Sequence, residues 1–285
     1  MKRITIPLLA LILAGCTHEK NALIEQGNYK IDRGNYTVDT RITSANANER
    51  IRFLVMHYTA VDDKESLRLL TQPDGGASAH YLIPSVPAVD GGKPVVLGLV
   101  PERRRAWHAG VSHWAQRDNL NDTSIGIEIV NLGFTEGLTG KHWYPYTPEQ
   151  IELVARMAQD IATRYGISPD NILAHSDIAP QRKHDPGPLF PWEMLAKRGI
   201  GAWPSKEAVV KYLAGRDPAA TASVKVIQTA LAKYGYQIPQ NGELDEETRK
   251  VLIAFQMHFR PSDISGSADA QTEALALALV EKYRQ

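Results

Sequence analysis

IRFLVMHY, residues 51–58, is the stretch that decides the fold, because it is a dense run of apolar and branched residues with the length of a strand. Three later runs have the same character: AHYLI (79–83), VVLGLV (95–100) and SIGIEIV (124–130). Helical patterns lie between and after these runs. Strands mixed with helices in this way predict an α/β domain in which helices pack on a central β-sheet.

One of these helices is marked at both ends. In TPEQIELVARMAQDIATRYG, residues 147–166, Thr147 is expected to cap the start, with Pro148 in the first turn and Gln150 completing a capping box. Gly166 can end the helix. The apolar residues fall on one face, which is expected to pack on the sheet: Ile151, Val154, Ala155, Ala158, Ile161, Ala162 and Tyr165.

The chain changes character near its C-terminal end. From about residue 206 the pattern is helical only, in three pieces: VKVIQTALAKYG, DEETRKVLIAFQMHF, which starts at the expected cap Asp245, and DAQTEALALALVEKY. Three short amphipathic helices predict a small three-helix bundle over residues 206–285. The stretch IGAWPSKEA around Pro204 is expected to link this bundle to a first domain over residues 45–200.

The first residues have the layout of a secretory signal: a basic start, Met1-Lys2-Arg3, and then an apolar run that is too short to span a membrane. The run closes on LAGC (13–16), which resembles the lipobox of bacterial lipoproteins. That resemblance implies a signal peptide over residues 1–16, acylation of Cys16 and a tether over residues 17–44. Thr17 follows where an Asp would suggest inner-membrane retention, so the expected location is the outer membrane, with the protein body in the periplasm. The alternative is an ordinary signal peptide that happens to contain a cysteine.

The charge balance and the cysteine count limit which partners and metal ligands the protein can have. Lys and Arg number 32, as do Asp and Glu, so the formal net charge is zero, which argues against a nucleic-acid partner. Cys16 is the single cysteine of the sequence. If it carries lipid, the mature chain has no thiol left for a disulfide, and a transition-metal site must be built from His and carboxylates.

The loop HSDIAPQRKHDPGP, residues 175–188, gathers titratable side chains among prolines, which disfavour a regular helix or strand. A catalytic zinc site needs three protein ligands and an open position for water. His57, at the end of the first strand run, and two residues of this loop would meet that count. The residues alone leave open which two among His175, Asp177, His184 and Asp185 bind the metal. They predict a zinc hydrolase, because chemistry without metal has no GxSxG motif or usable cysteine to support it. The absence of HExxH sets aside the common plan in which a helix carries the zinc ligands.

Glu128 is a further candidate, because it lies between Ile127 and Ile129 in an apolar strand. A carboxylate in such a place either faces solvent or is desolvated in a cleft with a raised pKa.

Five motifs in order carry a more specific resemblance: HYT (57–59), SAHYLI (78–83), AWHAG (106–110), LNDTSIGIEIVN (120–131) and HSDIAPQRKHDPGPLFPW (175–192). Together they resemble the zinc-dependent N-acetylmuramoyl-L-alanine amidases of the type-2 family over about residues 45–195. The resemblance implies the mixed central β-sheet of that family, which is shared with peptidoglycan recognition proteins. It also implies hydrolysis of the amide between N-acetylmuramic acid and L-alanine. With the lipobox and the C-terminal helices, it points to the AmiD-type outer-membrane lipoproteins within the family.

Carried over residue by residue, the resemblance assigns one zinc ion to His57, His175 and Asp185. It makes Glu128 and Lys183 the catalytic pair, with Glu128 moving the proton and Lys183 stabilising the oxyanion. Substrate contacts are expected at the remaining motif residues: His80, Trp107 and His108.

The direction of side chains in an extended loop supports this ligand choice. Adjacent residues point to opposite sides, so His184 and Asp185 are not expected to reach one metal together. Lys183 and Asp185 are two apart and share a side, which would bring an ammonium and a ligand to the same centre. On this basis Asp177 and His184 are expected to support the site or to lie exposed.

The tail also resembles a known module. YGYQIPQNGELDEETRKVLIAFQ (234–256) is similar to the three-helix peptidoglycan-binding domain, although PSDISGSADAQT (261–272) departs from it by placing Ser267-Ala268 within the pattern. The expected partners are therefore peptidoglycan and muropeptides, with outer-membrane lipid reached through acylated Cys16. The competing function is a non-catalytic lipoprotein that binds peptidoglycan or tethers the outer membrane to the wall.

Overall fold

The computed structural model describes residues 29–138 and 140–284 and divides the chain into two compact units, Met1–Asn48 and Glu49–Gln285. In the first unit, β1 (Lys30–Asp32) and β2 (Thr37–Asp39) form an exposed antiparallel hairpin. The predicted signal peptide and Cys16 lie outside the described residues. Within the described part of the chain, no helix has both the length and the apolar content that crossing a membrane requires.

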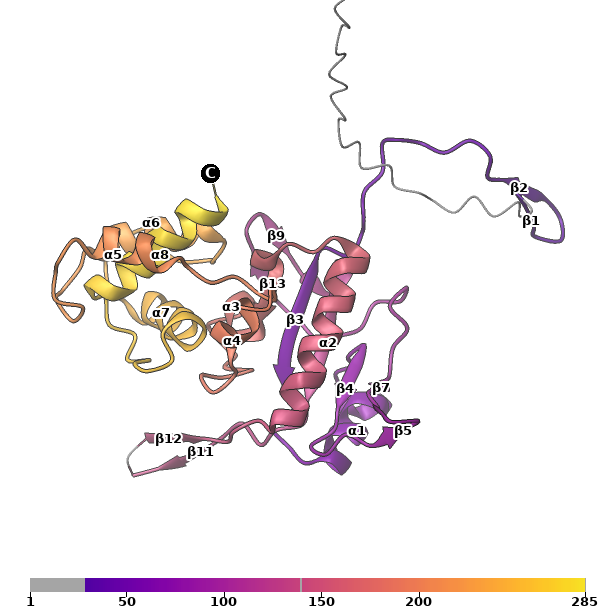
Figure 1. The fold of residues 1–285 in the computed structure, drawn as a ribbon, viewed down its shortest axis with the longest axis horizontal. Coiled ribbons are helices and arrows are strands. Elements are labelled where there is room, and N and C mark those ends of the chain that lie inside the picture. Colours follow the sequence, from indigo (N-terminus) through magenta and orange to yellow (C-terminus); the bar gives the residue numbers. More distant parts are fainter. Residues whose placement is uncertain (1–28, 139, 285) are drawn as a thin grey trace, which may run out of the picture. The chain divides into compact units, whose positions relative to one another are not determined.

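The second unit is built on a five-stranded sheet with the order β13-β3-β10-β4-β7 (Figure 1). The strands are β3 (Phe53–Tyr58), β4 (Tyr81–Ile83), β7 (Leu97–Gly98), β10 (Ser124–Ile129) and β13 (Ile172–Ala174). β13, β3, β10 and β4 run parallel, and β7 pairs antiparallel with β4. The predicted α/β class with a mixed central sheet is confirmed, and each predicted strand run contains one of these strands.

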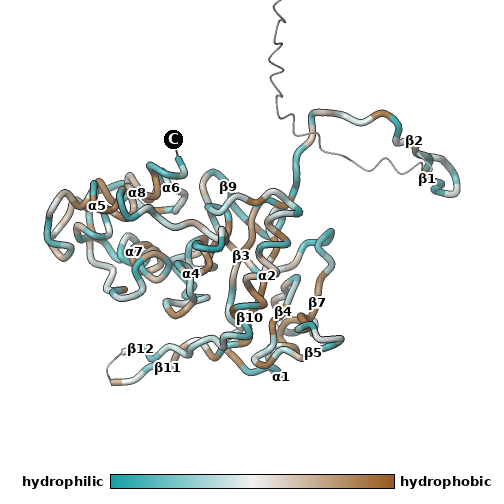
Figure 2. The backbone as a smooth tube through the Cα atoms, in the orientation of Figure 1, coloured by the Kyte–Doolittle hydropathy of each residue, from teal (hydrophilic) through white to brown (hydrophobic). Residues whose placement is uncertain are grey.

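One face of the sheet is covered by α2 (Pro148–Tyr165), which Figure 1 shows running alongside β3. The predicted capping box is present, because the Thr147 hydroxyl accepts from the Gln150 backbone and the Gln150 side chain accepts from the Thr147 backbone. Hydrophobic stretches follow β3 and the turns of α2 (Figure 2). This core contains alternate strand residues, among them Leu54, Met56 and Ile127.

Because side chains alternate along a strand, the remaining residues of β3 point to the opposite face. Phe53 and Val55 belong there to a second core, and His57, two residues further on, continues the same row. The strand thus brings a histidine to the end of an otherwise apolar row.

Shorter elements surround the sheet. They are α1 (Asp63–Thr71), β5 (Val89–Asp90), β6 (Lys93–Pro94), β8 (His113–Trp114), β9 (Arg117–Asp118), β11 (Phe134–Gly137), β12 (Gly140–Trp143), α3 (His175–Ile178) and α4 (Trp192–Ala196).

The C-terminal region is helical, as predicted, but it contains one helix more than the three expected. α6 (Val224–Tyr234), α7 (Glu246–Phe259) and α8 (Ala270–Tyr283) correspond to the predicted pieces, and Asp245 caps α7 through its side chain. The additional helix is α5 (Lys206–Leu213), capped by Ser205, which packs on α8. It has eight residues, about two turns, and begins within the stretch expected to be a linker, so its pattern is too short to separate from a loop.

The helical region shares its core with the sheet. Phe53, Val55 and Leu173 from the strands join Phe255 and Leu231 from the helices in one buried cluster. Residues 49–284 therefore behave as one packed body, in which the helices cover the sheet face opposite α2.

Trp114 in β8 is a large side chain at this junction, and it is 1% exposed. Its ring meets Tyr234 and Tyr236 edge to face, with centroids 5.5 and 5.0 Å apart. The next residue, Ala115, donates its backbone N–H to the Gly235 carbonyl at 2.7 Å. A Cβ on Gly235 would lie 2.8 Å from the indole, so a glycine is needed at this position for the ring to enter.

Trp114→Ala should lower the free energy of unfolding by about 3–5 kcal/mol, because it removes a buried aromatic side chain at the junction. Trp107→Ala is the matched control: its side chain is 56% exposed, so the loss should stay within about 0.5 kcal/mol. Denaturant unfolding of the two variants checks this. If the loss of unfolding free energy in Trp114→Ala is as small as that in Trp107→Ala, the Trp114 contact contributes nothing to docking of the helices.

Candidate metal centre and active site

Two parallel strands and one loop bring the three predicted ligands together. His57 lies near the C-terminal end of β3, and His175 follows β13, which pairs in parallel with β3. The ends of parallel neighbours meet at one edge of the sheet, which is where ligand sites form in such folds. Asp185 reaches the same edge from the loop after α3.

The three side chains converge closely. The Nδ1 atoms of His57 and His175 are 2.9 Å apart, and the Asp185 Oδ2 lies 3.0 Å from each. All three residues are buried, and their ligand atoms form a group that could hold a metal ion. Neither of the other two candidates left open in the loop, Asp177 and His184, belongs to this group.

Hydrogen bonds beyond the centre determine which nitrogen of His57 carries a proton. The Ser124 hydroxyl donates its single hydrogen to the Leu120 carbonyl at 2.6 Å, so it must accept from the His108 Nε2, 3.0 Å away. Burial holds the pKa of His108 well below its ordinary value, so the ring is neutral and its Nδ1 can only accept. That Nδ1 lies 3.0 Å from the His57 Nε2, which therefore donates. The His57 Nδ1 is left with a free lone pair.

His175 is held in the same way by a backbone group. Its Nε2 donates to the Ala109 carbonyl at 3.1 Å, which in the neutral ring leaves the lone pair on Nδ1. Two nitrogen lone pairs and a carboxylate then face one another at about the 3.3 Å expected between ligand atoms of tetrahedral zinc with bonds near 2.0 Å. Only a cation between them relieves their repulsion, so the donor set suits a bound metal.

The protonation of the centre agrees with this arrangement. Burial, reinforced by neighbouring His175, lowers the pKa of His57 to about 4, so its ring is neutral at pH 7. Burial alone would raise the pKa of Asp185, but His175 and His57 outweigh it and hold that pKa well below its usual value. Neutral imidazoles and an ionised carboxylate are the forms that bind metal.

Glu128 lies on the neighbouring strand, opposite His57 in the register of β10 and β3. Burial, together with the nearby charge of Asp185, raises the pKa of Glu128 to about 8. Its Oε2 is buried and has no hydrogen-bond partner among the described residues. Glu128 and Lys183 line the same hollow of about 220 Å³, with Asp185 and His175 in its wall. A carboxyl group and an ammonium group therefore flank the three ligands.

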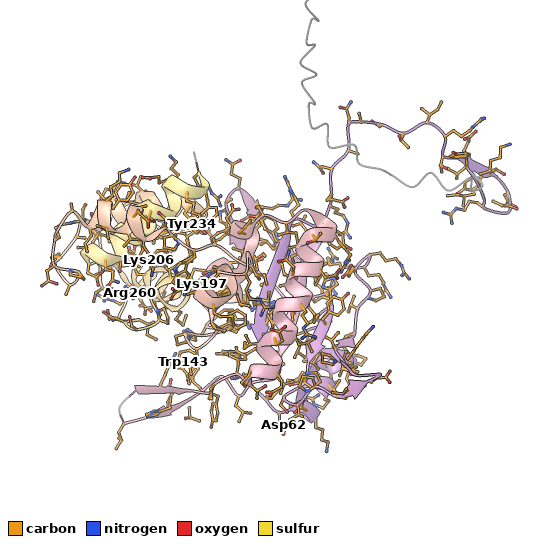
Figure 3. All side chains as sticks on the ribbon, viewed as in Figure 1. Asp62, Trp143, Lys197, Lys206, Tyr234 and Arg260 are labelled. Atoms are coloured by element: carbon orange, nitrogen blue, oxygen red, sulfur yellow. The ribbon has the colours of Figure 1, made fainter. Side chains whose placement is uncertain are left out.

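The structure turns His184 away from the centre. Its ring packs against Phe134 and Trp143 of the β11–β12 hairpin, with centroids 5.8 and 6.5 Å apart, and its Nε2 lies 3.2 Å from the Lys141 Nζ. The side chain of Trp143 can be located in Figure 3, where it is labelled. The alternation expected along the loop is therefore present, with His184 and Asp185 on opposite sides.

The three predicted substrate-contact residues occupy different environments. His80 is fully buried, and its side chain bonds the Arg104 carbonyl and the Gly126 amide, so the prediction that it contacts substrate is corrected. His108 reaches the wall of the hollow, but both its nitrogens are used to orient His57. Trp107 is exposed beside Arg105, whose guanidinium carbon lies 4.1 Å from the ring centroid. Substrate contact at Trp107 stays a prediction.

Sequence reasoning missed Ser124 and Ala109, which orient the two imidazoles. Ser124 lies in the quoted run SIGIEIV, where a small residue at the start of a strand carries no signal of its own. Ala109 acts through its carbonyl, which any residue would provide. The pattern AWHAG located this segment without showing its role.

Comparison with known proteins agrees with this geometry. A model of the N-acetylmuramoyl-L-alanine amidase family matches residues 47–188, and one of a peptidoglycan binding domain matches residues 221–275. The chain is 49% identical over 276 residues to N-acetylmuramoyl-L-alanine amidase AmiD of Escherichia coli, covering 97% of this chain and 96% of the relative. The chain belongs to this amidase family. It is an enzyme that hydrolyses the amide bond between N-acetylmuramic acid and L-alanine.

Two solved structures extend the similarity to three dimensions. The complex of E. coli AmiD with anhydro-N-acetylmuramic acid-L-Ala-D-γ-Glu-L-Lys superposes with a TM-score of 0.86 at 48% identity, covering 90% of this chain and 99% of that one. AmpDh3 of Pseudomonas aeruginosa with an anhydromuramic pentapeptide gives 0.77 at 43% identity, covering 89% and 98%. Both comparisons span the sheet and the helical region, so the amidase fold of this chain includes its C-terminal helices.

Asp185→Ala should lose bound zinc and activity together, whereas His184→Ala should keep one zinc per chain and most of its activity. The reason is that Asp185 supplies one of three converging ligand atoms, while His184 packs on the hairpin. Metal analysis of the purified variants measures this directly. Zinc retained in the Asp185 variant and lost in the His184 variant would reverse the assignment.

Glu128→Gln should lower turnover by roughly a hundred- to ten-thousand-fold while zinc stays bound, as expected for the loss of a proton-transfer group. A second readout is thermal stability without metal. The carboxyl is protonated in the folded chain up to about pH 8 but ionises near 4.5 when unfolded, so it makes stability fall as the pH rises between these values. In Glu128→Gln, stability should therefore decrease less between about pH 4.5 and pH 8 than it does in the unmodified chain. An unchanged pH profile together with near-normal turnover would make Glu128 a structural carboxylate.

Proposed function

We propose that the enzyme uses a single zinc ion held by His57, His175 and Asp185. The observation that carries the proposal is the convergence of two imidazole lone pairs and a carboxylate, each about 3 Å from the next. A bound zinc ion supplies positive charge that polarises the scissile carbonyl, lowers the pKa of water towards about 7 and favours the ionised form of Glu128.

The chain's own residues then divide the remaining work. Glu128 takes a proton from the attacking water and delivers it to the L-alanine nitrogen as the C–N bond breaks. Lys183, on the same hollow, stabilises the negative charge that develops on the carbonyl oxygen. The second proton of the water passes from the new carboxylic acid to the amine, so the products are the lactyl carboxylate of the muramic acid and a peptide with an L-alanine ammonium group. Atoms and charge then balance with one water consumed.

We infer that both polymeric peptidoglycan and soluble muropeptides are substrates, including those with a 1,6-anhydro sugar. Anhydromuramoyl peptides are bound in the two similar structures, and a peptidoglycan binding domain model covers part of the helical region. That region would hold insoluble wall near the centre and so raise the effective concentration of its bonds.

The test is incubation of a form lacking residues 1–16 with purified sacculi and, separately, with an anhydromuramoyl peptide. We expect new amino ends on L-alanine from both substrates and loss of release when a chelator removes the metal. New reducing sugars would indicate glycan cleavage instead. Binding to sacculi without any product would favour a wall-binding or tethering protein.

We further propose that Cys16 is acylated and anchors the enzyme in the outer membrane, with its body in the periplasm. The support is the sequence LAGC behind a short apolar run. Cys16→Ser should leave activity intact in a soluble extract and remove the protein from the membrane fraction, because acyl chains provide the membrane affinity. Recovery of the variant in the outer-membrane fraction would overturn the anchor.

A further inference from the structure

Asp177 is a buried acid of the predicted metal loop that the centre does not use. It is 1% exposed and lies in α3, two residues after His175. Its Oδ2 accepts the Ala174 backbone N–H at 2.8 Å and the His258 Nδ1 at 2.7 Å, and its Oδ1 accepts the Tyr236 hydroxyl at 2.5 Å. Both side-chain donors come from the C-terminal helical region, 59 and 81 residues away along the chain.

Packing fixes the direction of these donors. The His258 ring is 2% exposed and stacks on Trp192, with centroids 4.0 Å apart and an angle of 18° between planes. The Tyr236 ring is held edge to face by Trp114. Neither donor can turn away without breaking the junction, so Asp177 is held between two rigid side chains.

Asp177 holds the segment that contains His175 and Asp185, two of the three proposed metal ligands. α3 begins at His175, and its second residue, Ser176, donates its backbone N–H to the Asp185 carbonyl at 2.9 Å. The backbone N–H of Lys183 bonds the Ala179 carbonyl at 3.0 Å. Two ligands and the predicted electrophile are thus attached to this one turn of helix.

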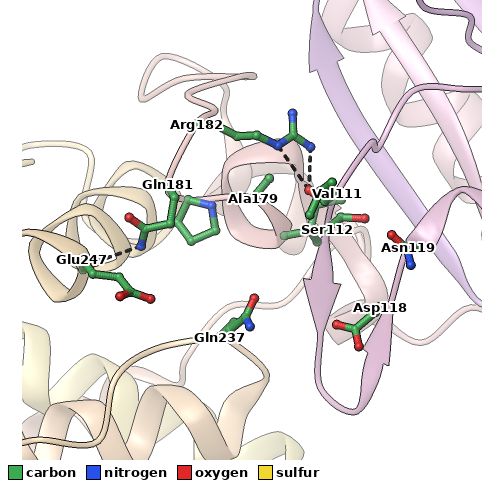
Figure 4. A pocket seen from close by; sticks show the side chains of 11 residues that line it. Val111, Ser112, Asp118, Asn119, Ala179, Gln181, Arg182, Gln237 and Glu247 are labelled. Carbon is green, nitrogen blue, oxygen red and sulfur yellow. Dashed lines mark hydrogen bonds between the residues drawn. The ribbon is translucent and has the colours of Figure 1, made fainter.

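The same loop is tied to the helices on its other side. A hollow of about 370 Å³ lies at this junction. Figure 4 draws the side chains that line it, among them Gln181, which donates to the Glu247 carbonyl of α7 at 3.0 Å. Arg182 donates to the Val111 carbonyl at 2.7 Å and also to the Ala109 carbonyl, which accepts from His175. The helices therefore contact the metal-binding segment from two directions.

We propose that His258 and Tyr236 are positioning residues for the amidase reaction: by holding Asp177 they fix α3 in the place where His175 and Asp185 meet one metal. The C-terminal helices are then part of the catalytic architecture, in addition to any contact with the wall. The inference rests on the proposed metal ligands. Groups that hydrogen-bond a metal ligand directly typically change metal affinity about 10–100-fold when removed. His258 and Tyr236 act one step further out, through Asp177, so we expect an effect at the lower end of that range.

The experiment measures zinc affinity by competition with a chelator, together with kcat and KM on a soluble anhydromuramoyl peptide. His258→Leu, in the otherwise intact soluble chain, should bind zinc about tenfold more weakly and lose kcat with little change in KM. His258→Asn should recover most of both, because its amide N–H can take the place of Nδ1. Tyr236→Phe, which removes one hydroxyl and keeps the ring, should shift zinc affinity in the same direction by a smaller factor.

A matched control separates positioning from general destabilisation. Gln256 lies on the same helix, is fully buried and bonds only groups within the helical region, at Gly266, Ser267 and Thr272. Gln256→Leu should lower the melting temperature while zinc affinity stays at the wild-type value.

Wild-type zinc affinity in folded His258→Leu, or an equal loss of affinity in Gln256→Leu, would overturn the proposal. If His258→Leu does not fold, unchanged affinity in folded Tyr236→Phe overturns it. Failure of the proposed function would look different, since the unmodified chain would then bind no zinc at His57, His175 and Asp185.

Discussion

The catalytic part is arranged around three electron-pair donors that face one another without a proton between them. They are the Nδ1 atoms of His57 and His175 and the carboxylate of Asp185. The serine hydroxyl at the start of β10 fixes His108, which in turn fixes His57, and the backbone carbonyl of Ala109 fixes His175, so that both ligand Nδ1 atoms point inward. Such a cluster is repulsive by itself and becomes favourable when a cation enters. The register of β10 on β3 then decides the chemistry, because it sets Glu128 beside His57.

The sheet has two apolar faces, and both are covered by other elements while one end of the sheet stays open. α2 covers one face along the length of β3, and the alternation of side chains sends Phe53, Val55 and His57 to the other. The helical region covers the apolar part of that second face. What remains uncovered is the end of the row, where apolar residues give way to His57 and the hollow begins.

Much of this was readable from sequence, for identifiable reasons. The β3 and β10 runs, the capping box of α2 and the cap at Asp245 are local signals, and all four are present in the structure. The ligands came from motif resemblance, with the alternation along the loop favouring Asp185 over His184. Contacts between side chains far apart in the sequence left no local sequence pattern from which they could be predicted. The bonds from Tyr236 and His258 to Asp177, like the burial of His80, depend on which surfaces meet, and composition could not separate a structural histidine from one that touches substrate.

The docking of the helices also limits how they can act on a polymer. A wall-binding domain on a flexible linker raises effective concentration over all the distances that the linker allows. Here the Trp114 ring packs edge to face on Tyr234 and Tyr236, and Asp177 accepts the Tyr236 hydroxyl, so the helices and the centre form one packed body. Wall bound by the helices would therefore present its amide bonds to the centre at one fixed separation. The contacts that would set this separation are the same ones that hold the turn carrying His175.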